Sequence, residues 1–287
     1  MSGSGYDYSC GTYSPDGRIF QIEYALKAVE NSGTAIGIKC TDGVVIAVGK
    51  PQASKMLVPG SNRCVFGIDK GTGMVVTGYA ADGRQLVNRA RVEAENYADT
   101  YGHRIIPSVL ANRLSLYVHY FTIYGSLRPF GSSALVASYD GDLKEPQLYM
   151  VEPSGACLRF FGCAAGKGAN AAKTEIEKLL NKQGSTGISC RDAVKELARI
   201  LQVIRDPAKD KPLEIEMGWL CAENNFVFGH VPAVLVRSAD EAALAELGSR
   251  EGLPTASAES EAMQEDTPVP ADVVVDEREM DITSDLQ

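Results

Sequence analysis

The order of periodic segments along the chain constrains its fold more than any other feature. Short apolar, β-branched runs predict strands at 35–40, 44–48, 64–68, 74–79, 132–139, 147–151, 156–164, 213–220 and 225–228. Helical periodicity predicts helices between these strands at 84–101, 108–125, 168–181 and 190–204. Because strands and helices come in blocks rather than in alternation, the order favours antiparallel sheets with helices outside. We therefore expect an α+β fold in which two sheets carry a pair of helices on each outer face.

Turn residues fix how the first strands pair. Thr41-Asp42-Gly43 separates the runs 35–40 and 44–48, and Asp and Gly both tolerate the positive φ of a tight hairpin turn. Gly71-Thr72-Gly73 joins the next pair of strands in the same way. Pro107 and Gly125 are expected to begin and end the helix over 108–125. The sequence thus predicts two hairpins ahead of the first helix pair.

The N-terminal residues 6–24 combine a turn, a helix start and an amphipathic stripe. Ser14-Pro15-Asp16-Gly17 is typical of a turn, since Pro15 fixes its own φ and Gly17 is free to adopt a positive φ. Ile19, Ile22, Leu26 and Val29 then fall on one face of a helix. A further helix is therefore expected before the first strand.

Charge and composition divide the chain near residue 239. Its net charge is −9, but 240–287 hold fourteen acidic residues against Arg250 and Arg278, so the remainder is slightly basic. A last helix over 239–247 is expected, and the Glu, Ser, Thr and Pro-rich residues 249–287 are predicted to be a disordered acidic tail. Neither part offers the basic field that a nucleic-acid partner requires.

The same residues bear on the compartment. No apolar run reaches the roughly 18–20 residues of a membrane span, and the N-terminus lacks the pattern of a signal peptide. Seven scattered cysteines indicate reduced thiols rather than a disulfide framework. We expect a protein of the cytoplasm and nucleus without a membrane partner.

Two patterns for bound groups are weak. Residues 166–171 fit G-x-G-x-x-A, but a dinucleotide site needs a parallel strand after the helix, and the segment from Asp192 is predicted to be helical. A tight strand-to-helix turn is the preferred interpretation. His103, His119 and His230 are isolated, and there is no Cys-x-x-Cys and no Gly-x-Ser-x-Gly. The sequence therefore predicts neither a metal nor a cofactor.

The run from Tyr13 to Tyr24 closely resembles the signature of alpha-type subunits of the 20S proteasome, with Gly11 as one departure. Within that family, residues 27–31, 128–131, 153–155 and 171–179 are similar to the alpha-7 type, also called alpha type 3. The resemblance covers 5 to about 238. It implies a four-layer αββα sandwich of the N-terminal nucleophile hydrolase type, non-catalytic and with an added N-terminal helix. Its domains would be a gate segment 1–13, an alpha-type domain 14–248 and the tail 249–287.

The resemblance also implies a function and partners. Alpha-type subunits are non-catalytic structural and gating subunits, seven of which form each outer ring, with contacts to beta-ring subunits and to activators in protein degradation with or without ubiquitin. The family's gate residues correspond to Tyr6, Asp7, Pro15 and Tyr24, whereas Tyr8 stands where some members have Arg. Activator docking corresponds to Gly78 and to Arg63, one position away from the family's lysine.

Two alternatives stay open at this stage. Gly33-Thr34 resembles the site at which active beta-type relatives release a threonine nucleophile, but Thr34 follows 33 residues and no acid follows the hairpin at Ala47-Val48-Gly49-Lys50. Intact mass would show whether residues 1–33 are removed. The other alternative is a stand-alone binding scaffold that uses the acidic tail, which predicts a monomer instead of a large assembly.

Overall fold

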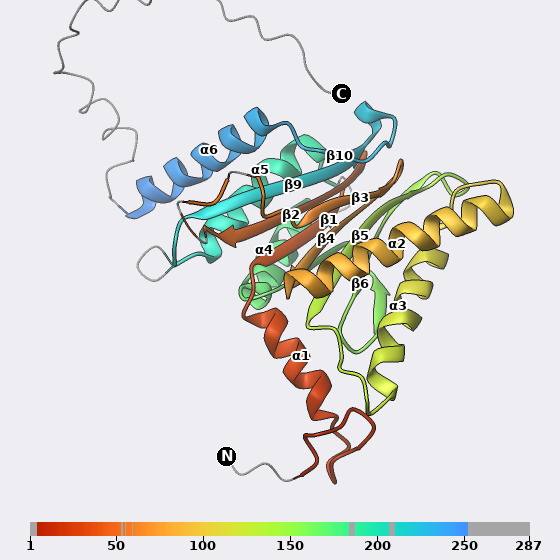
Figure 1. Ribbon diagram of the computed structural model, residues 1–287. Helices are drawn as coiled ribbons and strands as arrows, with labels where there is room; N and C mark the ends of the chain where they lie inside the picture. Colours follow the sequence, from red (N-terminus) through yellow and green to blue (C-terminus); the bar gives the residue numbers. More distant parts are fainter. Residues whose placement is uncertain are drawn as a thin grey trace, which may run out of the picture.

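The computed structural model describes residues 5–251, except 53, 55, 59, 184–186 and 207–209 (Figure 1). Two five-stranded antiparallel sheets pack face to face, with helices on both outer surfaces. The helices are α1 Phe20–Glu30, α2 Ala80–Tyr101, α3 Pro107–Ile123, α4 Ala169–Gln183, α5 Cys190–Ile204 and α6 Ala233–Glu251. The strands are β1 Thr34–Lys39, β2 Gly43–Pro51, β3 Val65–Asp69, β4 Thr72–Gly78, β5 Ser132–Asp140, β6 Glu145–Val151, β7 Cys157–Arg159, β8 Gly162–Ala165, β9 Leu213–Cys221 and β10 Gly229–His230.

Each sheet is covered by its own helices, so the predicted α+β sandwich is confirmed. The first sheet has the order β10-β9-β2-β1-β8 and carries α4, α5 and α6. The second has the order β3-β4-β5-β6-β7 and carries α2 and α3. Among the described helices, none is long and apolar enough to cross a membrane.

The central strands are buried on both faces, which explains their unbroken apolar runs. In β2, Val44 and Ile46 pack between the two sheets, whereas Val45 and Ala47 pack against the helices. Successive side chains of a strand point to opposite faces, so both faces of β2 must be apolar. The Asp42-Gly43 turn sets the register, with Lys39 paired to Val44. Both predicted hairpins are therefore present.

Helix α1 projects from the sandwich, against which its C-terminal end packs, and carries the N-terminal segment at its far end (Figure 1). Only its last turns are deeply packed, through the buried Ala25 and Val29. Ile19, Ile22 and Leu26 are half-buried, as expected for the apolar face of a short helix. The predicted turn is confirmed as well, because Gly17 N–H donates to Ser14 O over 2.9 Å.

Three predicted elements differ in the structure. The run 156–164 divides into β7 and β8, which belong to different sheets. The Phe160 N–H donates to the Leu148 carbonyl of β6, whereas the Phe161 carbonyl accepts from the Lys39 N–H of β1. Helix α3 ends at Ile123, not at Gly125. Helix α6 spans Ala233–Glu251 and crosses the predicted boundary at residue 248. Residues 1–4 of the expected gate segment and 252–287 of the expected tail lie outside the described residues.

The predicted strand 225–228 is wrong. Asn225 and Phe226 have φ of 52° and 55°, which a strand cannot accommodate, and the last strand is β10 at 229–230. The aromatic residues pack instead: Phe226 stacks on Tyr139 with ring centroids 3.8 Å apart. Phe228 lies against Gly73 of one sheet and Gly218 of the other, where a Cβ would come within 1.9 Å and 2.6 Å of its ring. Phe228 therefore packs between the two sheets and does not add a strand to either of them.

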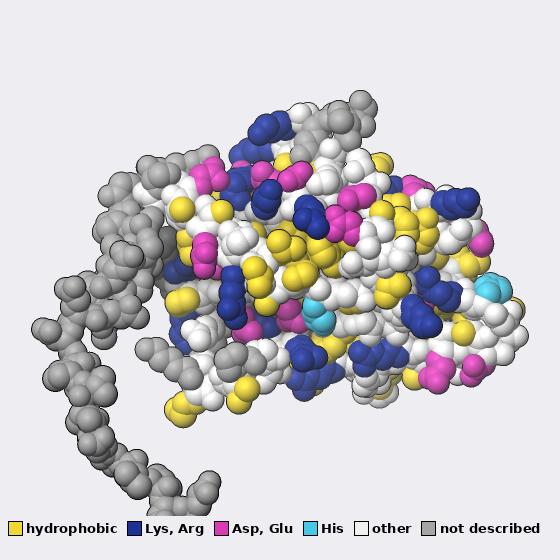
Figure 2. Space-filling view, turned by 90° about the horizontal axis from the view of Figure 1, so that it is seen from above, with side chains coloured by type: hydrophobic (Ala, Val, Ile, Leu, Met, Phe, Trp, Pro, Cys, Tyr) yellow, Lys and Arg dark blue, Asp and Glu magenta, His cyan; other side chains and the backbone are white. Residues whose placement is uncertain are grey.

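Side chains on the face of the molecule seen from above are mixed in charge (Figure 2). Lysine and arginine alternate with aspartate and glutamate around a group of hydrophobic side chains near the middle. This face therefore presents no continuous basic field of the kind that binds a phosphate backbone.

Candidate functional site

Thr34, the candidate nucleophile, is the first residue of β1 and pairs with Gly49 of β2. Its side-chain oxygen accepts a hydrogen bond from the Gly168 N–H over 3.0 Å. The preceding residue, Gly33, is fixed too, since its carbonyl accepts from the Thr77 hydroxyl. In the full-length chain the nitrogen of Thr34 is an amide, which cannot accept a proton as a free α-amine does.

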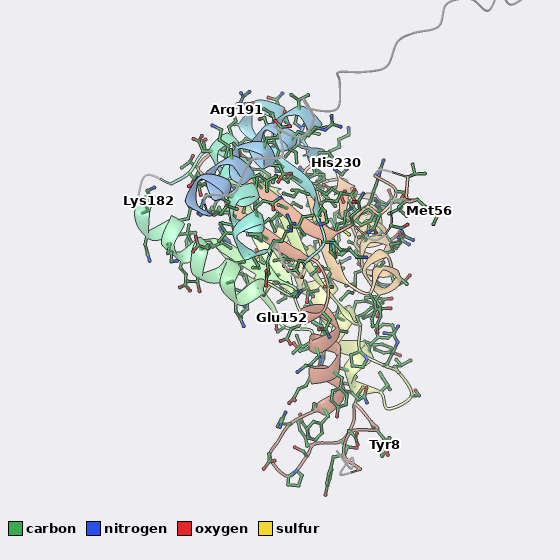
Figure 3. All side chains as sticks on the ribbon, turned by 90° about the vertical axis from the view of Figure 1, so that its left-hand side faces the viewer. Tyr8, Met56, Glu152, Lys182, Arg191 and His230 are labelled. Carbon is green, nitrogen blue, oxygen red and sulfur yellow. The ribbon has the colours of Figure 1, made fainter. Side chains whose placement is uncertain are left out.

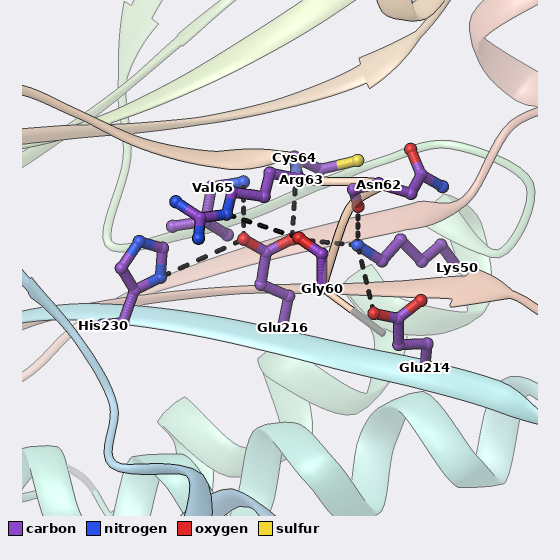
Figure 4. A network of polar contacts seen from close by, with 9 residues as sticks. All are labelled: Lys50, Gly60, Asn62, Arg63, Cys64, Val65, Glu214, Glu216 and His230. Carbon is purple, nitrogen blue, oxygen red and sulfur yellow. Dashed lines mark hydrogen bonds and ion pairs between the residues drawn. The ribbon is translucent and has the colours of Figure 1, made fainter. Parts of the chain in front are cut away.

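Lys50 is the last residue but one of β2, and it is almost fully buried. Its ammonium lies 3.0 Å from Glu216 Oε2 and 3.7 Å from Glu214 Oε1, and it donates to the Asn62 carbonyl (Figure 4). Strands β2 and β9 are neighbours, with Lys50 opposite Glu214, which brings these groups together. The cation is fully engaged in this network and does not orient Thr34.

Glu216 connects the network to the start of β3. It accepts from the backbone N–H groups of Cys64 over 2.9 Å and Val65 over 3.3 Å, and His230 lies 4.0 Å away. Burial raises the pKa of the Cys64 thiol above its ordinary value. One carboxylate thus satisfies a buried ammonium and two amides, which holds the loop before β3 against β9.

The candidate docking residues Arg63 and Gly78 line one cavity of about 210 Å³. Lys50 and Arg84 line it as well, so cations surround it on several sides. Gly78 has φ +117°, and a Cβ there would lie 2.2 Å from the Gly131 carbonyl, so no other residue fits. The sequence indicated Arg63 and Gly78 but not Lys50, whose place beside them depends on the β2–β9 pairing.

Thr34 borders a second cavity of about 450 Å³, whose lining includes Leu201 and Ile204 of α5. The Lys167–Asp210 ion pair, whose charged atoms lie 2.7 Å apart, lines it as well. The G-x-G-x-x-A residues form the turn at its edge. Gly166 has φ +106° and packs on the Gly33 carbonyl, and β8 pairs with β1 in antiparallel orientation. The turn interpretation is confirmed, because the parallel strand that a dinucleotide site needs is replaced by α5.

The segment before α1 is held at few points. The Ser14 hydroxyl accepts from Arg18 N–H over 3.0 Å, and Arg18 pairs with Glu23. The carboxylate of Glu23 holds the pKa of Arg18 above its ordinary value. Further out, the buried Cys10 thiol donates to the Leu127 carbonyl over 3.7 Å, which attaches the segment to the loop after α3.

The four expected gate residues lie at this end of the molecule, where Figure 3 labels Tyr8. Tyr6, Tyr24 and Pro15 are exposed, and Asp7 is half-buried. The Asp7 carbonyl accepts from the Gln21 side chain, while its Oδ1 is enclosed without a hydrogen-bond partner in the described part of the chain. No hydrogen bond joins the four residues to one another within residues 5–251.

Two family models match the sequence. The model of the proteasome subunit family matches residues 29–220, and the model of the N-terminal signature of A-type proteasome subunits matches residues 6–28. The alpha type-3 proteasome subunit of Spinacia oleracea is 52% identical over 245 residues, covering 85% of this chain and 96% of that protein. The chain belongs to the proteasome alpha-subunit family.

Other proteasome relatives agree with this assignment. The alpha type-3 proteasome subunit of Dictyostelium discoideum is 50% identical over 233 residues, 81% of this chain and 92% of that protein. A probable alpha type-7 proteasome subunit of Schizosaccharomyces pombe is 46% identical over 241 residues, 84% of this chain and 93% of that protein. The resemblance to the alpha-7 or alpha type-3 branch is therefore confirmed.

The histidines of this proteasome alpha-type chain are far apart in the fold. His119 lies in α3 with its Nδ1 3.1 Å from the Thr122 hydroxyl, His103 lies after α2 beside Tyr97, and His230 lies in β10. The structure does not bring them together. It does bring together a set that the sequence analysis missed, Cys40, Asp42 and Cys190, which are distant in sequence.

Proposed function

We propose that this chain is a non-catalytic structural and gating subunit of the alpha ring of the 20S proteasome. The observation that carries the proposal is the match of residues 6–28 to the N-terminal signature of A-type proteasome subunits, since these residues lead into helix α1 ahead of Thr34. A threonine nucleophile needs a free amine and a hydroxyl directed at substrate. Retention of helix α1 would leave Thr34 without a free amine, which supports a role in assembly.

The proposed partners are the other alpha subunits of a seven-membered ring, the beta-ring subunits and activator particles, in the cytoplasm and nucleus. The exposed N-terminal segment supports this proposal, since it extends from the end of α1 and carries exposed Tyr8 and Tyr13. Aromatic side chains with a polar end are frequent at protein interfaces. Such a segment is suited to contact neighbouring subunits around a pore.

Asp7 is the proposed centre of the gate contact. The residue is half-buried, so its carboxylate is partly accessible as an acceptor for a neighbouring tyrosine hydroxyl. The Ser14–Gly17 turn sets the direction in which Asp7 and Tyr6 leave the helix that carries Tyr24. A bond of this kind contributes on the order of 1 kcal/mol, which shifts a two-state gate several-fold.

The cavity beside Arg63 is the proposed docking site for activator C-termini. Its Arg63 and Arg84 side chains place positive charge where a terminal carboxylate would enter, whereas the Lys50 charge is balanced by Glu216 and Glu214. We expect Arg63→Ala to reduce activator-stimulated peptide hydrolysis while Arg63→Lys retains part of it. Equal stimulation of wild-type and Arg63→Ala particles would remove Arg63 from the docking site.

The test of the main proposal is covalent labelling of the assembled particle. An irreversible threonine-directed inhibitor should modify beta chains and leave the mass of this chain unchanged, with residues 1–33 retained. Catalytic beta chains in the same sample are the positive control. An adduct on Thr34, or loss of residues 1–33, would overturn the proposal.

The gate is tested separately. Deletion of residues 2–9 should raise basal hydrolysis of small peptides, whereas Asp7→Ala should weaken activator-stimulated opening and Asp7→Asn, which keeps an acceptor oxygen, should weaken it less. Turnover equal to wild type in all three, with normal particle yield, would show that other alpha chains alone control the entrance.

A further inference from the structure

Two cysteines and an aspartate meet at the end of the β1–β2 hairpin. Cys40 follows β1, Asp42 lies in the turn, and Cys190 is the first residue of α5. The two sulfur atoms and a carboxylate oxygen of Asp42 all lie within 4.8 Å of one another. Both thiols are buried and Asp42 is half-buried, so the cluster lies just below the surface.

Hydrogen bonds hold this cluster in place, although Cys190 comes 148 residues after Asp42 in the sequence. Asp42 Oδ1 accepts from the Cys190 N–H over 2.8 Å. Thr41 donates to the Ile188 carbonyl through its N–H over 2.9 Å and through its hydroxyl over 3.2 Å. Gly43 leaves room for the sulfur, since a Cβ there would lie 2.9 Å from Cys190 Sγ. The three donor groups are therefore preorganised.

Without a cation, this arrangement opposes ionisation of the thiols. Both thiols are buried, and a carboxylate oxygen of Asp42 lies within 4.8 Å of each sulfur. Three anions cannot be packed so closely in a buried site unless a positive charge compensates them. The N-terminus of α5 favours the anionic form of Cys190 but does not supply a full charge.

We propose that Cys40, Asp42 and Cys190 bind one divalent thiophilic cation of the zinc class. Two thiolates and a carboxylate are a ligand set that zinc accepts in a tetrahedral site, with water as the fourth ligand. On binding, each thiol releases one proton to solvent, so two protons leave for each cation bound. The site would fasten the β1–β2 turn to α5, and it does not depend on the role of the chain in a proteasome.

The competing explanation is that Asp42 serves only as a cap for α5. Asp42→Asn separates the two, because an asparagine oxygen still accepts from the Cys190 N–H but carries no charge. Cys163→Ser is the matched control, since Cys163 is a fully buried cysteine of β8 outside the cluster.

The full-length chain is titrated with Zn²⁺ in competition with a chromophoric chelator, and with Co²⁺ to detect thiolate-to-cobalt absorption. Wild type and Cys163→Ser should bind one equivalent with that absorption. Cys190→Ser and Cys40→Ser should lose it, and Asp42→Asn should bind at least about tenfold more weakly. Far-ultraviolet circular dichroism confirms that each variant is folded.

The release of protons gives a second readout in a weakly buffered titration, with about two protons per Zn²⁺ at neutral pH in wild type. Absence of a saturating equivalent in wild type would overturn the proposal. Equal binding in wild type, Cys190→Ser and Asp42→Asn would overturn it too, since the metal would then be held elsewhere.

Discussion

The start of β1 and the segment before α1 differ in how completely their polar groups are hydrogen-bonded and buried within the chain. Around Thr34, the hydroxyl, the Gly33 carbonyl and the Lys50 ammonium are all bonded and buried. Before α1, Tyr8 is 82% exposed and an oxygen of Asp7 is enclosed without a partner in the described chain. A region with every polar group satisfied within the chain is rigid and chemically closed, whereas an unsatisfied region is open to partners.

The largest expected effect is at the buried network. Glu216→Ala leaves the Lys50 ammonium with Glu214 at 3.7 Å and removes the acceptor of two amides. Loss of one partner of a buried ion pair costs about 3 kcal/mol in the free energy of unfolding. Urea unfolding of the full-length chain measures it. Glu214→Ala, at a more exposed side chain, is the matched control and should cost much less; equal costs would show that the region is not closed.

Asp82 of α2 lies between the two regions, since it lines one cavity together with Gln21 and Tyr24 of α1. Its carboxylate accepts from Arg128 over 2.6 and 2.8 Å and from Gly131 N–H over 2.8 Å, and the Arg128 bonds hold its pKa below the ordinary value. Asp82→Asn should cost about 2 kcal/mol at neutral pH.

The sign of the pH dependence follows from the lowered pKa of Asp82. Because the folded state favours the carboxylate, its contribution is complete above the ordinary carboxyl pKa and is lost as the pH falls through the lower, folded value. The difference in unfolding free energy between wild type and Asp82→Asn should therefore shrink in acid. A difference that stays constant as the pH falls would assign the effect to packing.

Thr34→Ala should have a smaller effect. It removes the acceptor of the Gly168 N–H, which costs about 1 kcal/mol, and Thr34→Ser should recover most of it. Thermal unfolding compares the two variants. Peptide hydrolysis by assembled particles should be the same for both, and a loss of activity confined to Thr34→Ala at equal particle yield would contradict the closed state of this region.

The smallest expected effect is at the exposed tyrosine. Tyr8→Ala should change the unfolding free energy by less than about 0.5 kcal/mol, because its side chain has few contacts in the chain. A cost above about 1 kcal/mol in urea unfolding would mean that the segment is part of the folded body, and the contrast with Thr34 would fail.

Local chemistry accounts for what the sequence predicted correctly. The Asp42-Gly43 turn and the Ser14–Gly17 turn depend on neighbouring residues, so both were predictable. The strand at 225–228 was predicted wrongly because its apolar residues are typical of a strand. The positive φ of Asn225 and Phe226 accompanies the packing of aromatic rings on the sheets, which local sequence does not reveal.

Sites formed by distant residues were harder to predict. The resemblance indicated Arg63 and Gly78, and the structure places both on one cavity. In the sequence, Lys50 marked only a position without an acidic residue. Its ion-pair partners Glu214 and Glu216 on β9 come 164 and 166 residues later, so the sequence did not reveal the network. Cys40 and Cys190 looked unrelated for the same reason: no local spacing records that α5 begins beside the first hairpin.

The contact of Phe228 with the two sheets limits which substitutions this chain can accept in evolution. Gly73 and Gly218 leave the space that the ring occupies, so a methyl group at either glycine displaces it. A drift to alanine at one glycine is tolerated only together with a smaller residue at 228. We therefore expect positions 73, 218 and 228 to covary, so that related sequences keep all three residues or replace them together.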